Sequence, residues 1–204
     1  MTSQQARNRQ FLSDLFGGPF RGHAIIMTPE EIPCDDLGDF AISNRPVRDW
    51  LPLMQQRYER QVKWLEALDD DSVPYVGFNT NTAVFASAFG CPVHLYGDSP
   101  AAARPIVWTA QEADSLPEPG LDAPTLSRVL ELGELVRQRL GPDVPIGVPD
   151  IQSPFDIAAL VWNKQDFYTA MMDSPDAVGR LVGKCHRLLK RFLTEFQARF
   201  PNCN

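Results

Sequence analysis

The sequence lacks the short motifs that mark the commonest nucleotide, metal and hydrolase sites. Neither G-x-x-x-x-G-K-[ST] nor G-x-G-x-x-G follows a predicted strand, so no glycine-rich loop is available to hold nucleotide phosphates. H-E-x-x-H and C-x-x-C do not occur, and G-x-S-x-G, the turn that carries the nucleophile of many hydrolases, is also absent. These absences argue against the ATPases, dinucleotide-dependent oxidoreductases, zinc proteases and serine hydrolases that such motifs define.

Positive charge, paired cysteines and long apolar runs are scarce as well. Acidic residues outnumber basic ones by 26 to 19, and the net charge of −7 argues against a nucleic-acid surface. The one basic cluster, Lys184–Arg191, is expected to be a solvated helix face. No apolar run approaches the ~20 residues that span a bilayer, and no signal peptide is visible. The four cysteines show no ligand spacing, which predicts a reducing cytoplasm: Cys34, Cys91, Cys185 and Cys203.

Apolar side chains recur at helical or extended spacing along most of the chain. Spacings of three and four predict a long helix at Arg48–Leu68 and a final helix from Ser174-Pro175 to Pro201. Other predicted helices are Ser3–Phe16, Ala83–Phe89, Thr125–Leu140, one from Ser153-Pro154, and Asp166–Met172; the first of these has Phe11, Leu12, Leu15 and Phe16 on its apolar side. Compact apolar runs predict three buried strands: His23–Met27, Val73–Phe78 and Val144–Val148. Strands that alternate with helices favour an α/β fold with parallel strands.

The segments between these elements lead to four further expectations. Thr28–Asn44 is long, acidic and without clear period, which makes it a candidate binding loop. Asp69–Ser72 is expected to be a solvated exit loop, because three like charges do not suit a helix C-terminus. Cys91–Gly97 and Pro105–Thr109 are expected to pair as a hairpin-like arm, with Asp98–Arg104 as the connection. Ala110–Ala123 is interpreted as connecting sequence.

Polar side chains follow two of the predicted strands directly. In parallel sheets the carboxyl ends of the strands share one edge, where α/β proteins build their sites. We therefore expect these side chains to bind a substrate, although each is also suited to cap a helix; Thr82 is one candidate cap for Ala83–Phe89. No catalytic residue and no metal ligand is identified. The substrate-binding candidates are Asn79, Asn81, Asp150, Gln152 and Asp156.

The phrase from Pro149 to Val182, PDIQSPFDIAALVWNKQDFYTAMMDSPDAVGRLV, resembles the uroporphyrinogen decarboxylase (URO-D) superfamily. A second, weaker match is Ala83–Val107, and the likeness runs from about His23 to the end, closer to the methyltransferase-like and uncharacterised branches. The resemblance implies a (β/α)₈ TIM barrel, which takes about 250 residues. Since only three or four barrel strands are visible, we expect residues 1–204 to be one domain, the N-terminal half of such a barrel. Self-association into a homodimer and a flavodoxin-like open sheet are the alternatives.

Departures from the family pattern shape the functional expectation. The aspartate with which the decarboxylases bind pyrrole N–H groups falls on Asn81, and a family tyrosine falls on Leu160. The loop that carries arginines in the decarboxylases has carboxylates here: Glu30, Glu31, Asp35 and Asp36. The resemblance thus favours a methyl-transfer enzyme, acting on corrinoid-bound methyl groups and thiols, over a uroporphyrinogen decarboxylase of porphyrin biosynthesis.

The resemblance also bears on cofactors and partners. Methyltransferases of this superfamily bind zinc through His and Cys residues of the second half, so we expect no cofactor in this chain, zinc only in a full-length parent, and incomplete catalytic machinery. The expected partner is a small molecule, a tetrapyrrole, a corrinoid-bound methyl group or a thiol, with neither nucleic acid nor membrane. A non-catalytic half-barrel that binds a ligand or partner is the remaining alternative.

Overall fold

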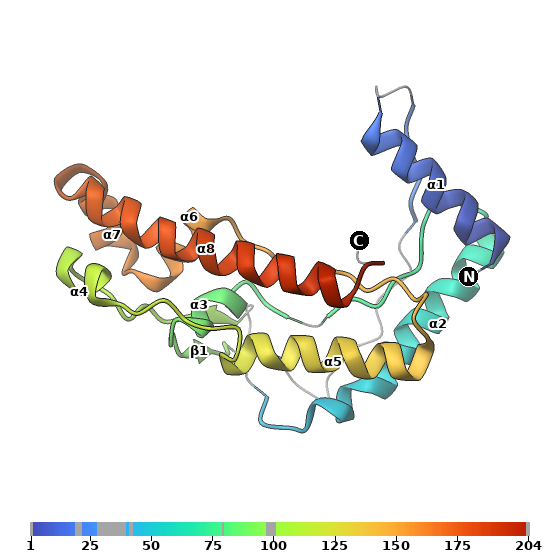
Figure 1. The fold of residues 1–204 in the computed structure, drawn as a ribbon, viewed down its shortest axis with the longest axis horizontal. Coiled ribbons are helices and arrows are strands. Elements are labelled where there is room, and N and C mark those ends of the chain that lie inside the picture. The colour runs from blue at the N-terminus through green and yellow to red at the C-terminus, as the bar shows by residue number, and fades with distance from the viewer. Residues whose placement is uncertain are drawn as a thin grey trace.

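The structure is a computed structural model that describes residues 2–18, 22–27, 40, 43–78, 80–96 and 101–202. Helices dominate it, and two long ones, α5 and α8, run beside each other across the molecule (Figure 1). The helices are α1 (Ser3–Gly17), the 3₁₀ turn η1 (Val47–Trp50), α2 (Leu51–Leu68), α3 (Val84–Ala88), α4 (Ala110–Ser115), α5 (Pro124–Leu140), α6 (Pro154–Val161), α7 (Lys164–Asp173) and α8 (Pro175–Arg199); the strands are β1 (Val93–His94) and β2 (Ala102–Ala103).

The final helix organises the core. α8 begins with Pro175 in its first turn, where a proline needs no N–H partner, and packs against α6, α4 and α7. Its predicted apolar stripe is confirmed, since every third or fourth side chain is buried: Val178, Leu181, Cys185, Leu188, Leu189, Phe192 and Phe196. Aromatic edge contacts join Phe192 to Phe85 of α3 and Phe196 to Phe78. α8 therefore packs against α3 and against the end of the Val73–Phe78 segment.

Two of the three predicted strands, Val73–Phe78 and Val144–Val148, form no extended strand, but the two segments meet at one parallel bridge. Val76 and Ile146 form a parallel bridge. The Val76 N–H donates to the carbonyl of Pro145, and the Gly147 N–H donates to the carbonyl of Val76, each at 2.9 Å. Val76 and Ile146 are each 1% exposed, and both side chains belong to the hydrophobic core. The two segments are therefore joined by one isolated parallel bridge, and the parallel sheet expected from the sequence stays a prediction beyond this point.

The prediction of a third buried strand at His23–Met27 is wrong. The segment 22–27 forms no strand, and Ile25 and Ile26 are 60% and 55% exposed. Its backbone instead bonds to the loop after α2, where the Asp71 N–H donates to the Ile25 carbonyl at 2.9 Å. An apolar run states only that a segment favours burial, and the described part of the chain provides no element that covers this one.

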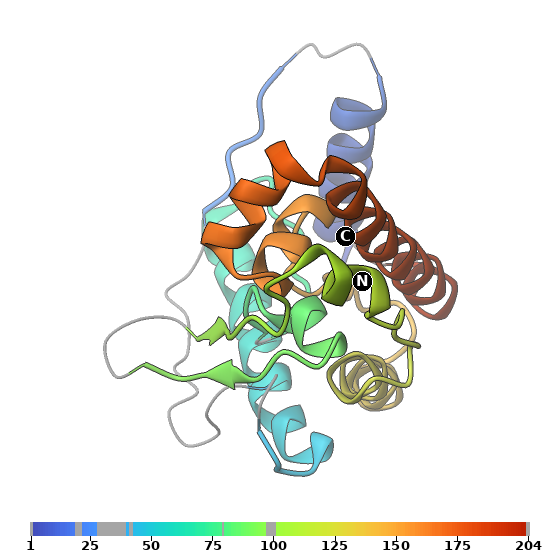
Figure 2. The same cartoon turned by 90° about the vertical axis from the view of Figure 1, so that its left-hand side faces the viewer.

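A hairpin forms at Cys91–Gly97, but its second strand is not the predicted Pro105–Thr109. β1 pairs antiparallel with β2, within the stretch expected to be the connection, and the pair lies at the edge of the molecule (Figure 2). The segment around Val107 pairs instead with Trp162, just after α6, in a second parallel bridge. The stretch interpreted as connecting sequence contains α4, which a capping box starts: Thr109 and Glu112 bond reciprocally. The T-x-x-E spacing of that box is visible in the sequence.

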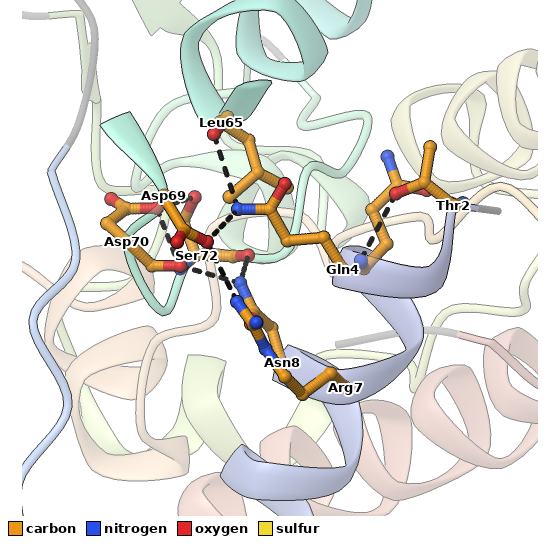
Figure 3. Close-up of polar contacts among 9 residues, drawn as sticks. Thr2, Gln4, Arg7, Asn8, Leu65, Asp69, Asp70 and Ser72 are labelled. Carbon is orange, nitrogen blue, oxygen red and sulfur yellow. Dashed lines mark hydrogen bonds and ion pairs between the residues drawn. The ribbon is translucent and has the colours of Figure 1, made fainter. Parts of the chain in front are cut away.

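α1 forms where predicted, but its buried side is polar. Gln5 and Asn8 are the buried residues of this helix, whereas Phe16 is 82% exposed. Figure 3 shows the reason: the Asn8 amide donates to the carbonyls of Asp70 at 2.7 Å and Ser72 at 2.9 Å. The helix therefore docks through hydrogen bonds to backbone carbonyls rather than through its phenylalanines.

Asp70 is a buried junction rather than part of a solvated loop. Its carboxylate accepts hydrogen bonds from the Ser72 hydroxyl at 2.7 Å, the Met27 N–H at 2.7 Å and the Ser72 N–H at 3.0 Å. Desolvation alone would raise the pKa of Asp70, but these three donors outweigh it and hold the pKa below its ordinary value. One carboxylate thus fixes the loop after α2 to the arm at 22–27, a role that the solvated-loop expectation missed.

The basic face of α8 is likewise not simply solvated. The Lys184 ammonium donates to the carbonyls of Ala113, Asp114 and Leu116 at 2.9, 2.8 and 2.7 Å. These carbonyls end α4, where a cation complements both the unpaired acceptors and the helix dipole. Neighbouring ion pairs hold the same junction: Arg180–Asp114, Arg187–Glu118 and Arg191–Glu118. The cluster that looked like a solvated face binds α4 and the loop after it.

Candidate functional site

The two strand ends meet at one rim. Thr80 and Asp150 each lie four residues beyond the paired positions Val76 and Ile146, so equal lengths of chain lead to both. The Asp150 N–H donates a hydrogen bond to the Thr80 hydroxyl oxygen at 2.9 Å. The loops that follow the strands are therefore in direct contact, as parallel pairing requires.

Asp150 and Gln152 form a polar pair at this rim. The Gln152 amide donates to Asp150 Oδ1 at 2.8 Å, and both residues are half-buried. The contact fixes the amide group, and the second carboxylate oxygen of Asp150 lies beside it. Such a pair offers hydrogen-bond acceptors and a negative charge to a polar ligand.

Asn81 follows Thr80 directly in the sequence and is half-buried. Its side-chain oxygen accepts the Ala83 N–H at 2.8 Å, and its carbonyl accepts the Val84 N–H at 3.3 Å. Asn81 thus holds the turn into α3, whereas Thr82 is exposed and makes no capping bond. The expectation that Thr82 caps this helix is wrong.

Asp156 is committed to the start of α6. The Asp156 N–H donates to the Ser153 hydroxyl at 3.1 Å, and that hydroxyl donates back to Asp156 Oδ2 at 2.7 Å. The predicted helix start at Ser153-Pro154 is confirmed, and the carboxylate is exposed at the first turn. Asn79 lies outside the described residues. Thr80, which sequence reasoning passed over, joins the cluster because its hydroxyl bridges the two strand ends.

An aromatic ring lies against the backbone of the two bridged segments that lead to the rim. A methyl group on Gly147 would lie 2.8 Å from Tyr75 Cδ2, and one on Gly77 would lie 3.4 Å from Tyr75 Cε2. The Tyr75 ring therefore rests on two neighbouring glycines, and it is 43% exposed. Sequence reasoning missed this ring, although the glycines stand at equivalent positions of the strands, one residue after Val76 and one after Ile146.

The described residues do not fit a zinc site. Across the ranges that the structure describes, no group of three or more His, Cys, Asp or Glu side chains is placed to hold a metal ion. Cys91 and Cys185 are both buried, and burial raises the pKa of each thiol to about 12. Zinc binds the thiolate, which such a pKa disfavours.

Comparison with known sequences places the rim within a family. The sequence profile of the family described as uroporphyrinogen decarboxylase (URO-D) matches residues 65–199, more than half of the 204 residues. The chain belongs to the URO-D family. The URO-D match includes both strands of the parallel pair and every described residue of the rim. Among curated proteins, none matches the sequence.

A solved structure has a similar fold. It is a methyltransferase from Methanosarcina mazei, with a TM-score of 0.59 at 16% identity. The likeness covers 89% of this chain and 52% of the methyltransferase, so the chain spans about half the length of this neighbour. At this identity the likeness establishes the fold, a mostly helical α/β arrangement of the URO-D type. Leu160, the position to which the resemblance assigned a family tyrosine, packs against the core in α6.

The length and the apolar character of a helix decide whether it can cross a membrane. In the described ranges, none combines the length and the apolar character that a membrane crossing needs. Most of the acidic loop expected at Thr28–Asn44, including Glu30, Glu31, Asp35 and Asp36, lies outside the described residues, which include only Phe40, Ser43 and Asn44 of it.

Proposed function

We propose that this chain is the N-terminal half of a URO-D-type (β/α)₈ barrel from the methyltransferase-like branch, and that its rim binds a small-molecule substrate. The rim consists of Thr80, Asn81, Asp150 and Gln152. The observation that carries the proposal is the hydrogen bond from the Asp150 N–H to the Thr80 hydroxyl, because it joins the carboxyl ends of two parallel strands, where barrel enzymes bind substrates.

Methyl transfer is favoured over porphyrin decarboxylation by the charge at the rim. A protonated pyrrole intermediate needs a negative charge next to its N–H groups. Asn81 is neutral, and its side-chain oxygen already accepts the Ala83 N–H. The ligands that this proposal assigns to the rim are a corrinoid-bound methyl group and a thiol acceptor.

The proposal also includes catalytic incompleteness. The rim supplies hydrogen-bonding groups and one carboxylate, Asp150, but Cys91 and Cys185 are buried with raised pKa values and are unsuited to hold the zinc of related methyltransferases. We infer that this chain binds its substrate and does not complete methyl transfer by itself. A non-catalytic half-barrel that binds another ligand or a partner is the second candidate, and failure of the chain to bind methylcobalamin in the titration described next would favour it.

The experiment is an equilibrium titration of the purified chain with methylcobalamin, followed by tryptophan fluorescence. We expect saturable binding, weakened about five- to tenfold by Gln152→Ala, since one hydrogen bond to a ligand contributes roughly 1 kcal/mol. Gln56→Ala, on the exposed side of α2, is the matched control and leaves the affinity unchanged. Absence of methylcobalamin binding to the wild-type chain would overturn the proposal.

Two activity measurements accompany the titration. With coenzyme M, zinc and methylcobalamin, we expect no loss of the cobalt–methyl absorbance; turnover would show that the catalytic machinery is complete and would overturn the inferred incompleteness. With uroporphyrinogen, we expect no coproporphyrinogen to form. Formation of that product would favour the decarboxylase alternative, in which Asn81 replaces a carboxylate without loss of activity.

A further inference from the structure

We propose that Tyr75 is a stacking platform for a flat, conjugated ring of the ligand. The inference rests on the proposed function, which locates the ligand site at the rim. It adds that the Tyr75 ring makes this site select flat ligands. The ring lies on the same strand pair that ends at the rim. It differs from the rim in chemistry, because an aromatic face binds another π system whatever that system's polar substituents.

The backbone of Tyr75 is clamped from α2. The Gln61 amide donates to the Tyr75 carbonyl at 2.9 Å, and the Tyr75 N–H donates to Gln61 Oε1 at 3.2 Å. One side chain thus satisfies both backbone polar groups of Tyr75. This two-point contact fixes the backbone from which the aromatic side chain extends. It also supplies a partner to each of the two backbone polar groups of Tyr75.

The glycines beneath the ring form its floor. A methyl group on Gly147 would lie 2.8 and 2.9 Å from two ring carbons of Tyr75, closer than real Cβ atoms approach any neighbour. Gly147 therefore gives the ring room to lie against the strand backbone. At Gly77 the corresponding distance is 3.4 Å, an ordinary van der Waals contact. The difference between these positions makes Gly147 the residue on which the ring's orientation depends.

The outer side of the ring is open. Tyr75 is 43% exposed, whereas its neighbour Val76, which points to the opposite face of the strand, is 1% exposed. Asp150 lies three residues beyond Gly147, about 10 Å along an extended chain. A tetrapyrrole-type macrocycle stacked on Tyr75 reaches the rim at that distance with its polar substituents. Because the ring is already oriented, stacking costs little side-chain entropy.

Two ring systems share this chemistry, the corrin and the porphyrin, and the test separates them. The full chain is titrated with hydroxocobalamin, with coproporphyrin III and with coenzyme M, which has no ring. We expect Tyr75→Ala to weaken binding of the preferred macrocycle about tenfold and to leave the thiol affinity unchanged. Tyr75→Phe retains the affinity, because the face and not the hydroxyl stacks. Tyr168→Ala, at a 59% exposed tyrosine of α7, is the matched control.

A glycine pair provides a second test that leaves Tyr75 in place. Gly147→Ala displaces the ring and lowers macrocycle affinity, whereas Gly77→Ala leaves it close to wild type. Urea unfolding of each variant establishes that the chain is folded. Equal effects of both alanines, or no effect of Gly147→Ala, would overturn the platform.

The outcomes separate this inference from the proposed function. If Gln152→Ala weakens binding and Tyr75→Ala does not, the rim stands and the platform is overturned. If Tyr75→Ala and Gly147→Ala weaken binding and Gln152→Ala does not, the platform stands and the rim fails. Sedimentation velocity covers the remaining case: a dimer that Tyr75→Ala dissociates, with unchanged macrocycle affinity, makes the ring an interface between copies and overturns the inference. Binding of neither macrocycle overturns both.

Discussion

The backbone N–H of Asp150 donates to the hydroxyl oxygen of Thr80 at 2.9 Å, across 70 residues of sequence. This single contact joins the loops that follow two parallel strands and creates the rim on which the proposed function rests. A threonine hydroxyl is suited to this position because it accepts the N–H with one lone pair and retains a donor and an acceptor for a ligand.

Replacing Thr80 tests that contact. Thr80→Val keeps the shape of the side chain but removes the acceptor, which leaves the N–H of half-buried Asp150 without this partner. We expect a loss of about 1–2 kcal/mol in the free energy of unfolding, measured by urea denaturation, together with weaker methylcobalamin binding. Thr82→Val, two residues further on and exposed, is expected to change neither quantity. Equal effects of the two valines would contradict the structural role given to Thr80.

The junction at Asp70 predicts a large difference between neighbouring aspartates. Both carboxylate oxygens of Asp70 accept hydrogen bonds, and Asp70→Asn replaces one of these oxygens with an NH₂ group, which cannot accept. We therefore expect the free energy of unfolding to fall by roughly 1–3 kcal/mol. Asp69→Asn alters an exposed carboxylate that pairs with Arg7 and accepts the Gln4 amide, and it is expected to cost much less. Hydrogen exchange of α1 measures both, and a larger effect at position 69 would contradict this account.

The lowered pKa of Asp70 also predicts a pH dependence. The folded-state pKa lies below the ordinary value of 3.8, so the folded chain binds a proton less readily than the unfolded chain. The stabilising contribution is complete above that ordinary value and is lost as the pH falls through the lower, folded-state pKa. We expect the urea midpoint of the wild-type chain to fall more steeply on acidification through this range than that of Asp70→Asn. Parallel curves would show that another group governs the acid sensitivity.

Lys184 is expected to hold α4 in place. Lys184→Met keeps the aliphatic part of the side chain and removes an ammonium that donates to three carbonyls. Because hydrogen bonds to a charged group contribute more than neutral ones, we expect a loss of about 1.5–3 kcal/mol and faster hydrogen exchange in α4. Lys190→Met, on the exposed side of α8, serves as control and is expected to stay near wild type.

Two helical glycines are expected to respond to alanine with opposite signs. Gly133 lies in α5 against Phe200, and an added methyl would come within 2.3 Å of that ring, so Gly133→Ala is expected to destabilise the chain. Gly179 lies in α8 with nothing within 4 Å of the added atom. There, alanine has the higher helix propensity, and Gly179→Ala is expected to stabilise by about 0.5–1 kcal/mol. Thermal unfolding distinguishes the signs directly.

Local sequence patterns determined most helices of this protein and the two segments that meet at one parallel bridge. The stripe of α8, the proline at its start and the serine cap of α6 follow from residues within a few positions of each other, because helix formation depends on neighbours along the chain. The parallel relation of Val76 and Ile146 was predictable for a similar reason, since a helix between two apolar runs favours a parallel crossover. The candidate rim residues Asn81, Asp150 and Gln152 followed from their position after these runs.

Tertiary structure alone decided which surfaces are covered. The apolar run at 22–27 is exposed while the polar Asn8 and Asp70 are buried, because burial depends on the element that packs there and not on the segment's own composition. Lys184 donates to a carbonyl at the end of α4 that lies 70 residues away in the sequence. The Tyr75 ring packs against Gly147, which belongs to the neighbouring segment. Such contacts join residues distant in sequence, so periodicity, which reports only on near neighbours, does not contain them.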